Sequence, residues 1–239
     1  MDIYDIIKSG NLEGVIQWHN DGKEITYEAM DEAAENGHLN IVKWLHENRT
    51  EGCSTKAIDD AAGNGFLDVV KWLHENRTKG CTTEAMDEAA GNGKLETLKW
   101  LHENRTEGCT TSAIDLAAIS GHFDIVKFLH ENRTEGCTNK AFDGIFNPSF
   151  YLDFSTYYKQ KEKIDSNNKT ILKFLYNNYK HLVTKVNDNT YEKLLPLIQE
   201  DFIKKFEKIE KENIVREFLS KKLVYHPSSC YMKRIVHNF

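Results

Sequence analysis

Residues 29–56 read AMDEAAENGHLNIVKWLHENRTEGCSTK, and this 28-residue stretch decides the fold. Closely similar stretches begin at Ala57, Ala85 and Ala113, and a fifth begins at Ala141. A pattern that returns at one fixed period indicates a solenoid, in which each unit buries its apolar face against its neighbours. The repeat therefore predicts one continuous stack of similar units.

Each unit is predicted to form two helices joined by a turn. In the first unit, Met30, Ala33 and Ala34 share one helical face, and Asn36-Gly37 is typical of a helix end. Further apolar residues at helical spacing predict the second helix: Leu39, Ile41, Val42, Trp44 and Leu45. A serine or threonine at one repeat position is suited to cap each first helix. These residues are Thr26, Ser54, Thr82, Thr110 and Thr138.

The run A-A-x-N-G-H-L-x-x-V-K-x-L closely resembles the ankyrin repeat. The landmark positions are occupied by Ala33, Ala34, Gly37, His38, Leu39, Val42 and Leu45. The resemblance implies an all-α, ankyrin-like helix–turn–helix solenoid with a helical C-terminal cap. The family's period is 33 residues, so these 28-residue repeats are expected to lack most of the β-hairpin finger. The family's Thr-Pro pair is missing, and Asp31 stands at its usual His position.

Four segments are expected along the chain. Residues 1–28 form a partial N-terminal capping repeat, and residues 29–140 form four full ankyrin-like repeats. Residues 141–182 form a fifth repeat with an insertion near 147–166, because its second-helix pattern returns after 46 residues and not after 28. A helical C-terminal cap and tail, residues 183–239, complete the chain.

The net charge of −6 hides two unlike parts of the chain. Residues 1–140 hold 14 basic and 25 acidic residues, whereas residues 141–239 hold 17 and 12. The acidic start of the chain does not resemble a signal peptide, and no stretch is apolar enough to predict a membrane span. Four of the five cysteines recur with the repeat, which indicates core thiols in a reducing compartment. We therefore expect a monomeric, intracellular, cytoplasmic protein.

Histidines and cysteines are the strongest candidates for metal ligands. Within one repeat, however, His46 and Cys53 supply only half of a tetrahedral zinc site. Equivalent side chains of adjacent repeats are expected about 8–10 Å apart, too far to share one ion. The sequence therefore predicts no metal and no cofactor.

Acidic pairs also recur with the repeat, among them Asp31 with Glu32 and Asp59 with Asp60. We expect these four side chains to lie on exposed helix positions. A catalytic pair of carboxylates is expected once in a chain, not in every repeat. The sequence therefore predicts neither an enzyme nor a small-molecule substrate.

Positions on the first helix vary between repeats while core positions barely change. In ankyrin repeats the first helices line the concave side of the stack, where members of the family usually bind partner proteins. The resemblance and the variation together predict a non-catalytic protein–protein interaction scaffold; drift of a solvated surface is the alternative explanation. The predicted partner-binding residues are Glu28, Glu32, Lys56, Asp60, Glu84, Glu88, Ser112 and Leu116.

Two further alternatives concern the C-terminal part of the chain. Residues 194–206 faintly resemble the opening of an F-box helix, which would imply an adaptor in protein degradation. An amphipathic capping helix predicts the same apolar stripe. The basic residues after position 140 could instead suit nucleic acid or an anionic surface. Lysines and glutamates alternate there, however, which argues against nucleic acid as the partner.

Overall fold

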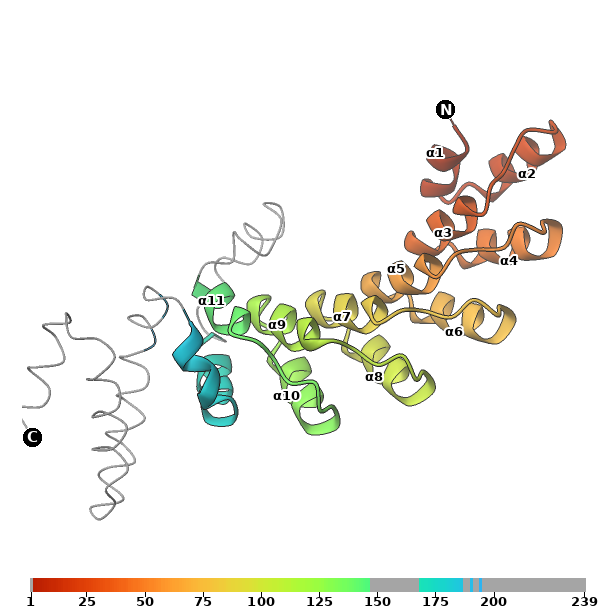
Figure 1. Ribbon diagram of the computed structural model, residues 1–239. Coiled ribbons are helices and arrows are strands. Elements are labelled where there is room, and N and C mark those ends of the chain that lie inside the picture. Colours follow the sequence, from red (N-terminus) through yellow and green to blue (C-terminus); the bar gives the residue numbers. More distant parts are fainter. Residues whose placement is uncertain (1, 147–167, 187–189, 191–193, 195–239) are drawn as a thin grey trace, which may run out of the picture. The chain divides into compact units, whose positions relative to one another are not determined.

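The computed structural model describes residues 2–146, 168–186, 190 and 194. The chain divides into two compact units, Met1–Leu194 and Leu195–Phe239, and every described residue belongs to the first unit. Every regular element of these described residues is a helix (Figure 1). The predicted all-α fold of repeated helix–turn–helix units is confirmed.

Helices follow one another in pairs, one pair per repeat (Figure 1). The first helices are α1 (Ile3–Lys8), α3 (Glu28–Glu35), α5 (Lys56–Asn64), α7 (Glu84–Gly91), α9 (Thr111–Ile119) and α11 (Lys140–Phe146). The second helices are α2 (Leu12–Asn20), α4 (Leu39–Asn48), α6 (Leu67–Asn76), α8 (Leu95–Asn104) and α10 (Phe123–Asn132). Consecutive first helices pack closely on one another, whereas consecutive second helices touch far less.

The close packing of the first helices follows from the pair of alanines in each. Ala61 and Ala62 of α5 are completely buried, and their methyl groups let the neighbouring helix backbones approach. The second helices bury larger side chains, such as Val69, Val70 and Leu73 of α6. Small residues on one side of the stack and larger ones on the other explain why the second helices fan apart in Figure 1.

A glycine in the left-handed backbone conformation ends the first helix of a repeat, as the sequence predicts. Gly65 has φ 84° and caps α5 at its C-terminal end, where its N–H donates to the carbonyl of Ala62 at 3.0 Å. Only glycine adopts this conformation without a steric penalty. The turn therefore sets the direction of the second helix in each repeat.

A buried aspartate joins each first helix to the next repeat, and this corrects an expectation from the sequence. Asp31 and Asp59 are predicted to be exposed but are only 8% and 2% exposed. Asp59 accepts hydrogen bonds from the backbone N–H and from the hydroxyl of Thr82, at 2.8 and 3.0 Å. The same pair of bonds joins Asp31 to Ser54, Asp87 to Thr110 and Asp115 to Thr138. The aspartates are therefore structural links between repeats.

The predicted capping role is confirmed for Thr110, the N-cap of α9, which accepts a hydrogen bond from the Ser112 N–H. Before α5 and α7 the equivalent hydroxyl stands one residue ahead of the N-cap and still accepts from the first helical N–H. The Thr82 hydroxyl oxygen accepts a hydrogen bond from the Glu84 N–H at 3.1 Å, and Ser54 does the same for the Lys56 N–H. One hydroxyl thus accepts from its own helix and donates to the aspartate of the preceding repeat. Both bonds satisfy polar groups at a helix start, where backbone N–H groups lack partners in the helix.

Aromatic and basic side chains link the C-terminal ends of the second helices. The ring of His46 meets the edge of Trp72 in the next repeat, with 5.1 Å between ring centroids. Its Nδ1 accepts a hydrogen bond from Arg77 Nη1 at 3.0 Å. The contacts recur one repeat on between His74, Trp100 and Arg105. Since arginine only donates, Nδ1 of each of these histidines is the acceptor in this hydrogen bond.

A helix formed by residues 168–178 packs on α10 much as α10 packs on α8. Phe174 meets the ring of His130 edge-on at 5.1 Å, as Phe128 meets His102 at 5.5 Å. The Tyr179 hydroxyl lies 2.9 Å from Nδ1 of His130, the place that an arginine takes beside His19, His46 and His74. The second-helix contacts therefore continue past the segment 147–167.

Several expectations concern residues outside the described part of the chain. These are the insertion near 147–166, most of the cap and tail at 183–239, and the F-box-like stretch that begins at Leu194. In the residues that the structure does describe, no helix has the length and apolar character needed to cross a membrane.

Candidate functional site

The residues predicted to bind a partner lie on four consecutive first helices, α3, α5, α7 and α9, each of which contacts the next. Those exposed to solvent are Glu28, Lys56, Glu84, Glu88 and Ser112. The half-buried ones are Glu32, Asp60 and Leu116. All eight side chains therefore reach one surface, which we call the first-helix face.

Carboxylates dominate the part of this face that α3, α5 and α7 provide. Burial raises the pKa of Asp60 above its usual value, and nearby carboxylates raise it further. Burial and then the charge of Asp60 raise the pKa of Glu88. Burial and then the charges of Glu32 and Asp60 raise the pKa of Glu35. The fold thus holds negative charges of three successive repeats close to one another.

Glycines under the first-helix face let these side chains lie across the neighbouring helix. A Cβ atom at Gly63 of α5 would lie only 2.7 Å from a carboxylate oxygen of Glu88 and 3.0 Å from its Cβ. At the equivalent position of α7, a Cβ at Gly91 would lie 3.1 Å from the Cβ of Leu116. The absence of a side chain at these glycines therefore helps to fix where Glu88 and Leu116 stand.

Amide side chains connect the C-terminal ends of the first helices along the same face. Asn64 Nδ2 donates to the carbonyl of Glu35, and Asn92 Nδ2 donates to the carbonyl of Gly63, both at 3.0 Å. These bonds connect α5 to α3 and α7 to α5. The carboxylates therefore stand on helices whose relative positions are fixed, which favours binding without rearrangement.

Positive charge on the face is sparse, and the acidic character ends at α9. Lys8 pairs with Glu32 at 3.5 Å, and Lys56 lies close enough to Asp60 to oppose the rise of its pKa. On α9 the variable positions carry Ser112 and Leu116, which are uncharged. The face is thus acidic over α3–α7 and neutral over α9.

Sequence reasoning missed two residues at the edge of the face. Tyr27, directly before α3, is 47% exposed, an unusual value for a large apolar side chain in this structure. Glu35 is exposed at the C-terminal end of α3 and takes part in the cluster of carboxylates. Both residues interrupt the repeat: the equivalents of Tyr27 are three threonines and Asn139, and those of Glu35 are glycine or isoleucine in the next three repeats. These departures from the repeat were the feature of the sequence from which Tyr27 and Glu35 could have been identified.

The recurring cysteines are buried thiols without a disulfide partner. Burial raises the pKa of Cys109 to about 11 and that of Cys137 to about 12, so both remain protonated at neutral pH. A thiol in that state is a poor nucleophile and a poor metal ligand. Across the described ranges, no group of three or more His, Cys, Asp or Glu side chains is arranged to hold a metal ion.

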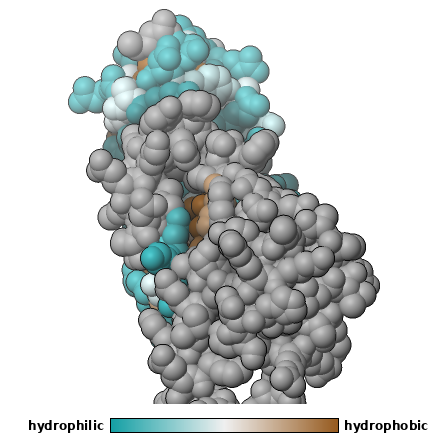
Figure 2. Space-filling view, turned by 90° about the vertical axis from the view of Figure 1, so that its left-hand side faces the viewer, coloured by the Kyte–Doolittle hydropathy of each residue, from teal (hydrophilic) through white to brown (hydrophobic). Residues whose placement is uncertain are grey.

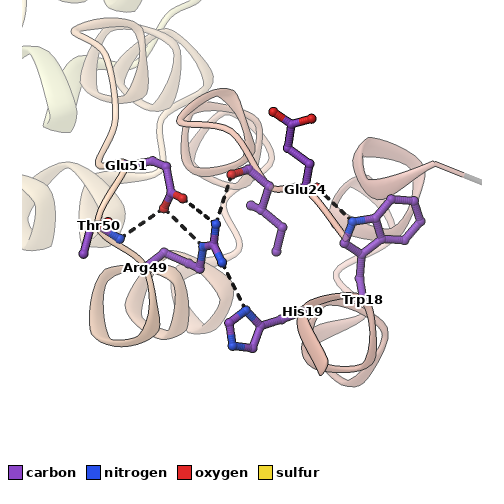
Figure 3. Close-up of polar contacts among 7 residues, drawn as sticks. Trp18, His19, Glu24, Arg49, Thr50 and Glu51 are labelled. Atoms are coloured by element: carbon purple, nitrogen blue, oxygen red, sulfur yellow. Dashed lines mark hydrogen bonds and ion pairs between the residues drawn. The ribbon is translucent and has the colours of Figure 1, made fainter. Parts of the chain in front are cut away.

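A small cavity lies beside Arg49, between α3, α4 and the loop that follows. Its volume of about 10 Å³ suffices for roughly one water molecule. Figure 3 shows the guanidinium of Arg49 held between Glu51 and the ring of His19. In the side view of Figure 2, the visible part of the described surface is mostly hydrophilic, with small apolar patches between the hydrophilic residues. The charged first-helix face therefore remains the strongest candidate site.

The cluster of carboxylates predicts a pH-dependent stability. The folded pKa values of Asp60 and Glu88 lie above their unfolded values, so their stabilising contribution is complete below the unfolded pKa and is lost as pH rises through the folded pKa. The double variant Asp60→Asn, Glu88→Gln should therefore be more stable than the parent chain at about pH 7. Because solvent screens these side chains, we expect only about 0.5 kcal/mol.

Urea unfolding at about pH 7 and about pH 5 measures this difference. The advantage of the double variant should shrink at the lower pH, where the carboxyls of the parent chain become protonated. A variant that is less stable than the parent at neutral pH would contradict the proposed repulsion. Titrating groups far from the first-helix face affect parent and variant alike, whereas Glu35 is relieved of the charge of Asp60 in the variant and adds to the expected gain.

Comparison with known families agrees with this geometry. Two segments, residues 30–74 and 86–130, match the family model described as ankyrin repeats (many copies). Each segment runs from one first helix into the second helix of the following repeat. A comparison with curated proteins found no significant match.

Proposed function

The chain is an ankyrin-repeat protein, and we propose that it is a non-catalytic scaffold that binds a basic surface of a partner protein through the first-helix face. Ankyrin repeats are protein–protein interaction modules. Their elongated surfaces suit extended contacts with another chain. The proposal adds to this general role a specific face and a specific partner chemistry.

The proposal is supported by a contrast between buried positions, which barely change between repeats, and exposed positions on the first helices, which differ. The buried aspartate is present at the same position of every repeat, for example Asp59 and Asp87. One residue further along each helix, the sequence changes from Glu32 to Asp60, Glu88 and Leu116. The contacts that build the stack are thus kept while its exposed residues differ, which is typical of a binding scaffold.

The chemistry of the face indicates what kind of partner fits it. The mutual repulsion of Glu35, Asp60 and Glu88 is relieved when lysine or arginine side chains of a partner lie between them. Tyr27 offers an exposed aromatic ring at the edge of the same face. Tyrosine often contributes strongly to binding at protein interfaces. A basic segment with an apolar side chain at one end would match both features.

The free cysteines support an intracellular site of action as part of the same proposal. Cys53, Cys81, Cys109 and Cys137 are buried thiols, and such thiols persist most readily in a reducing compartment.

Reversing two charges tests the face. The double variant Asp60→Lys, Glu88→Lys places like charges against a basic partner, and we expect binding to weaken at least about tenfold. The measurement is affinity capture from the source cells with quantification of each retained protein. A retained protein is then purified and its Kd is determined for the parent chain and each variant.

The matched control is the double variant Glu75→Lys, Glu103→Lys. It changes the net charge by the same amount in the same two repeats, but on exposed positions of the second helices α6 and α8. Circular dichroism checks that all three proteins remain helical. The proposal fails if the first-helix variant and the control bind the partner equally well.

A further inference from the structure

Three of the four repeat loops contain an arginine paired with a glutamate two residues later. In the first, Arg49 Nε donates to Glu51 Oε2 at 3.1 Å and its Nη2 donates to Oε1 (Figure 3). The N–H of Thr50 also donates to Glu51 Oε2, at 3.1 Å. The same three bonds form in the loops of Arg105 with Glu107 and Arg133 with Glu135. Each loop thus directs three N–H donors at one carboxylate.

The loop of the second repeat keeps the arginine but replaces the glutamate with Lys79. Arg77 is held as its counterparts are: its Nη1 donates to His46 Nδ1 at 3.0 Å, the distance found between Arg105 and His74. Its Nη2 lies over Gly52, where a Cβ atom would be only 2.2 Å away. The guanidinium of Arg77 therefore takes the same position as in the other loops, although no glutamate in the described ranges binds it.

Because Lys79 replaces a glutamate, the net charge of this loop is two units more positive than that of each of the other three loops. Among the described residues, no carboxylate lies within ion-pairing distance of Arg77 or Lys79. Burial raises the pKa of the nearby Cys53 thiol, and the charges of Arg77 and Lys79 both oppose that rise. Arg77 is half-buried and Lys79 is exposed. The loop thus combines a guanidinium held by His46 with an exposed ammonium.

We propose that Arg77, the N–H of Thr78 and Lys79 form a binding site for an oxyanion, either a carboxylate or a phosphate group. In the other three loops, the equivalent donors bind two oxygens of a glutamate carboxylate. In the loop of Arg77 the same donors are able to bind two oxygens of an external anion. A guanidinium that is already positioned loses little side-chain entropy when it binds. Lys79 adds a second positive charge at the point where the anion enters.

In the cell, the oxyanion would be an acidic or phosphorylated side chain of a partner protein. That assignment rests on the proposed binding function, whereas the anion site itself is a property of the loop. A test with small ions needs no partner and does not involve Asp60 or Glu88. Failure of this test and failure of the charge-reversal experiment are therefore distinguishable.

The test is NMR of the arginine Nε–H signals of the full chain, titrated with inorganic phosphate and, separately, with acetate at constant ionic strength. The signal of Arg77 should shift and saturate, while those of Arg49, Arg105 and Arg133 should not, because their own glutamates occupy the same donors. The variant Arg77→Lys identifies the signal. Response to phosphate alone would assign the site to phosphate groups, and response to both ions would include carboxylates. Equal, small shifts of all four arginines would overturn the proposal.

Two variants of the loop residue provide matched controls. Lys79→Glu restores the sequence of the sister loops and should weaken anion binding about tenfold or more, whereas Lys71→Glu makes the same charge change on α6 and should not. Conversely, Glu51→Lys should create a second anion-responsive arginine at Arg49. Unchanged binding in Lys79→Glu would contradict the site. Thermal unfolding confirms that these proteins remain folded.

Discussion

Replacing Asp59 with alanine is expected to lower the free energy of unfolding by about 3 kcal/mol. The carboxylate of Asp59 accepts two hydrogen bonds from Thr82 of the next repeat and is almost completely buried. Alanine leaves the Thr82 N–H without its acceptor in a partly buried site and removes the acceptor of the Thr82 hydroxyl. Burial raises the pKa of Asp59, and the bonds from Thr82 oppose that rise. Chemical denaturation followed by circular dichroism measures the loss.

The adjacent residue provides the control for this experiment. Asp60→Ala removes the same side chain one position further along α5, on the first-helix face, where its charge is repelled by other carboxylates. We expect Asp60→Ala to change stability by less than about 0.5 kcal/mol. Comparable losses in the two variants would show that the link between repeats contributes little. A loss below about 1 kcal/mol in Asp59→Ala would lead to the same conclusion.

Gly37→Ala is expected to destabilise the chain by about 3 kcal/mol. Gly37 has φ 75°, and a side chain in this left-handed conformation costs about 1–2 kcal/mol. The added Cβ would also lie 2.5 Å from the ring of Phe66 in the next repeat, which must move away. Overpacking of this kind adds about 1–3 kcal/mol. Urea unfolding of the variant and the parent chain measures the sum.

Gly121→Ala separates the two contributions. Gly121 occupies the same repeat position with φ 80°, but a Cβ there meets no heavy atom of the described residues within 4 Å. Only the backbone penalty applies, so we expect a loss of about 1–2 kcal/mol. The difference between the two variants measures the contact between Gly37 and Phe66. Equal losses would show that Phe66 adjusts at no cost.

Much of the fold could be predicted from single repeats of the sequence. The apolar spacing of Met30, Ala33 and Ala34 predicted a first helix, and Gly37 predicted its end. These are local properties, since helix periodicity and glycine conformation depend on a few neighbouring residues. The capping role of Thr110 was predicted for the same reason.

The candidate site was predicted in part. The eight residues of the first-helix face were identified from variation between repeats, and all of them reach the surface. Their role in binding remains a proposal. Tyr27 and Glu35 were missed because the prediction followed positions that recur, whereas these two residues are single departures from the repeat. Lys79 is a third departure, and its significance emerged only when the sister loops showed where the glutamate lies.

The repeat, the two helices of each unit and the resemblance to ankyrin repeats could be predicted from the sequence alone, because these follow from periodic patterns within 28 residues. Which acidic residues link one repeat to the next could be seen only in the tertiary structure. Asp59 and Asp60 are adjacent and chemically identical, yet Asp59 is buried against Thr82 and Asp60 is only half-buried on the first-helix face. The partner of Asp59 lies 23 residues away in the next repeat. Burial at this position depends on how two repeats stack, a contact that no pattern within one helix specifies.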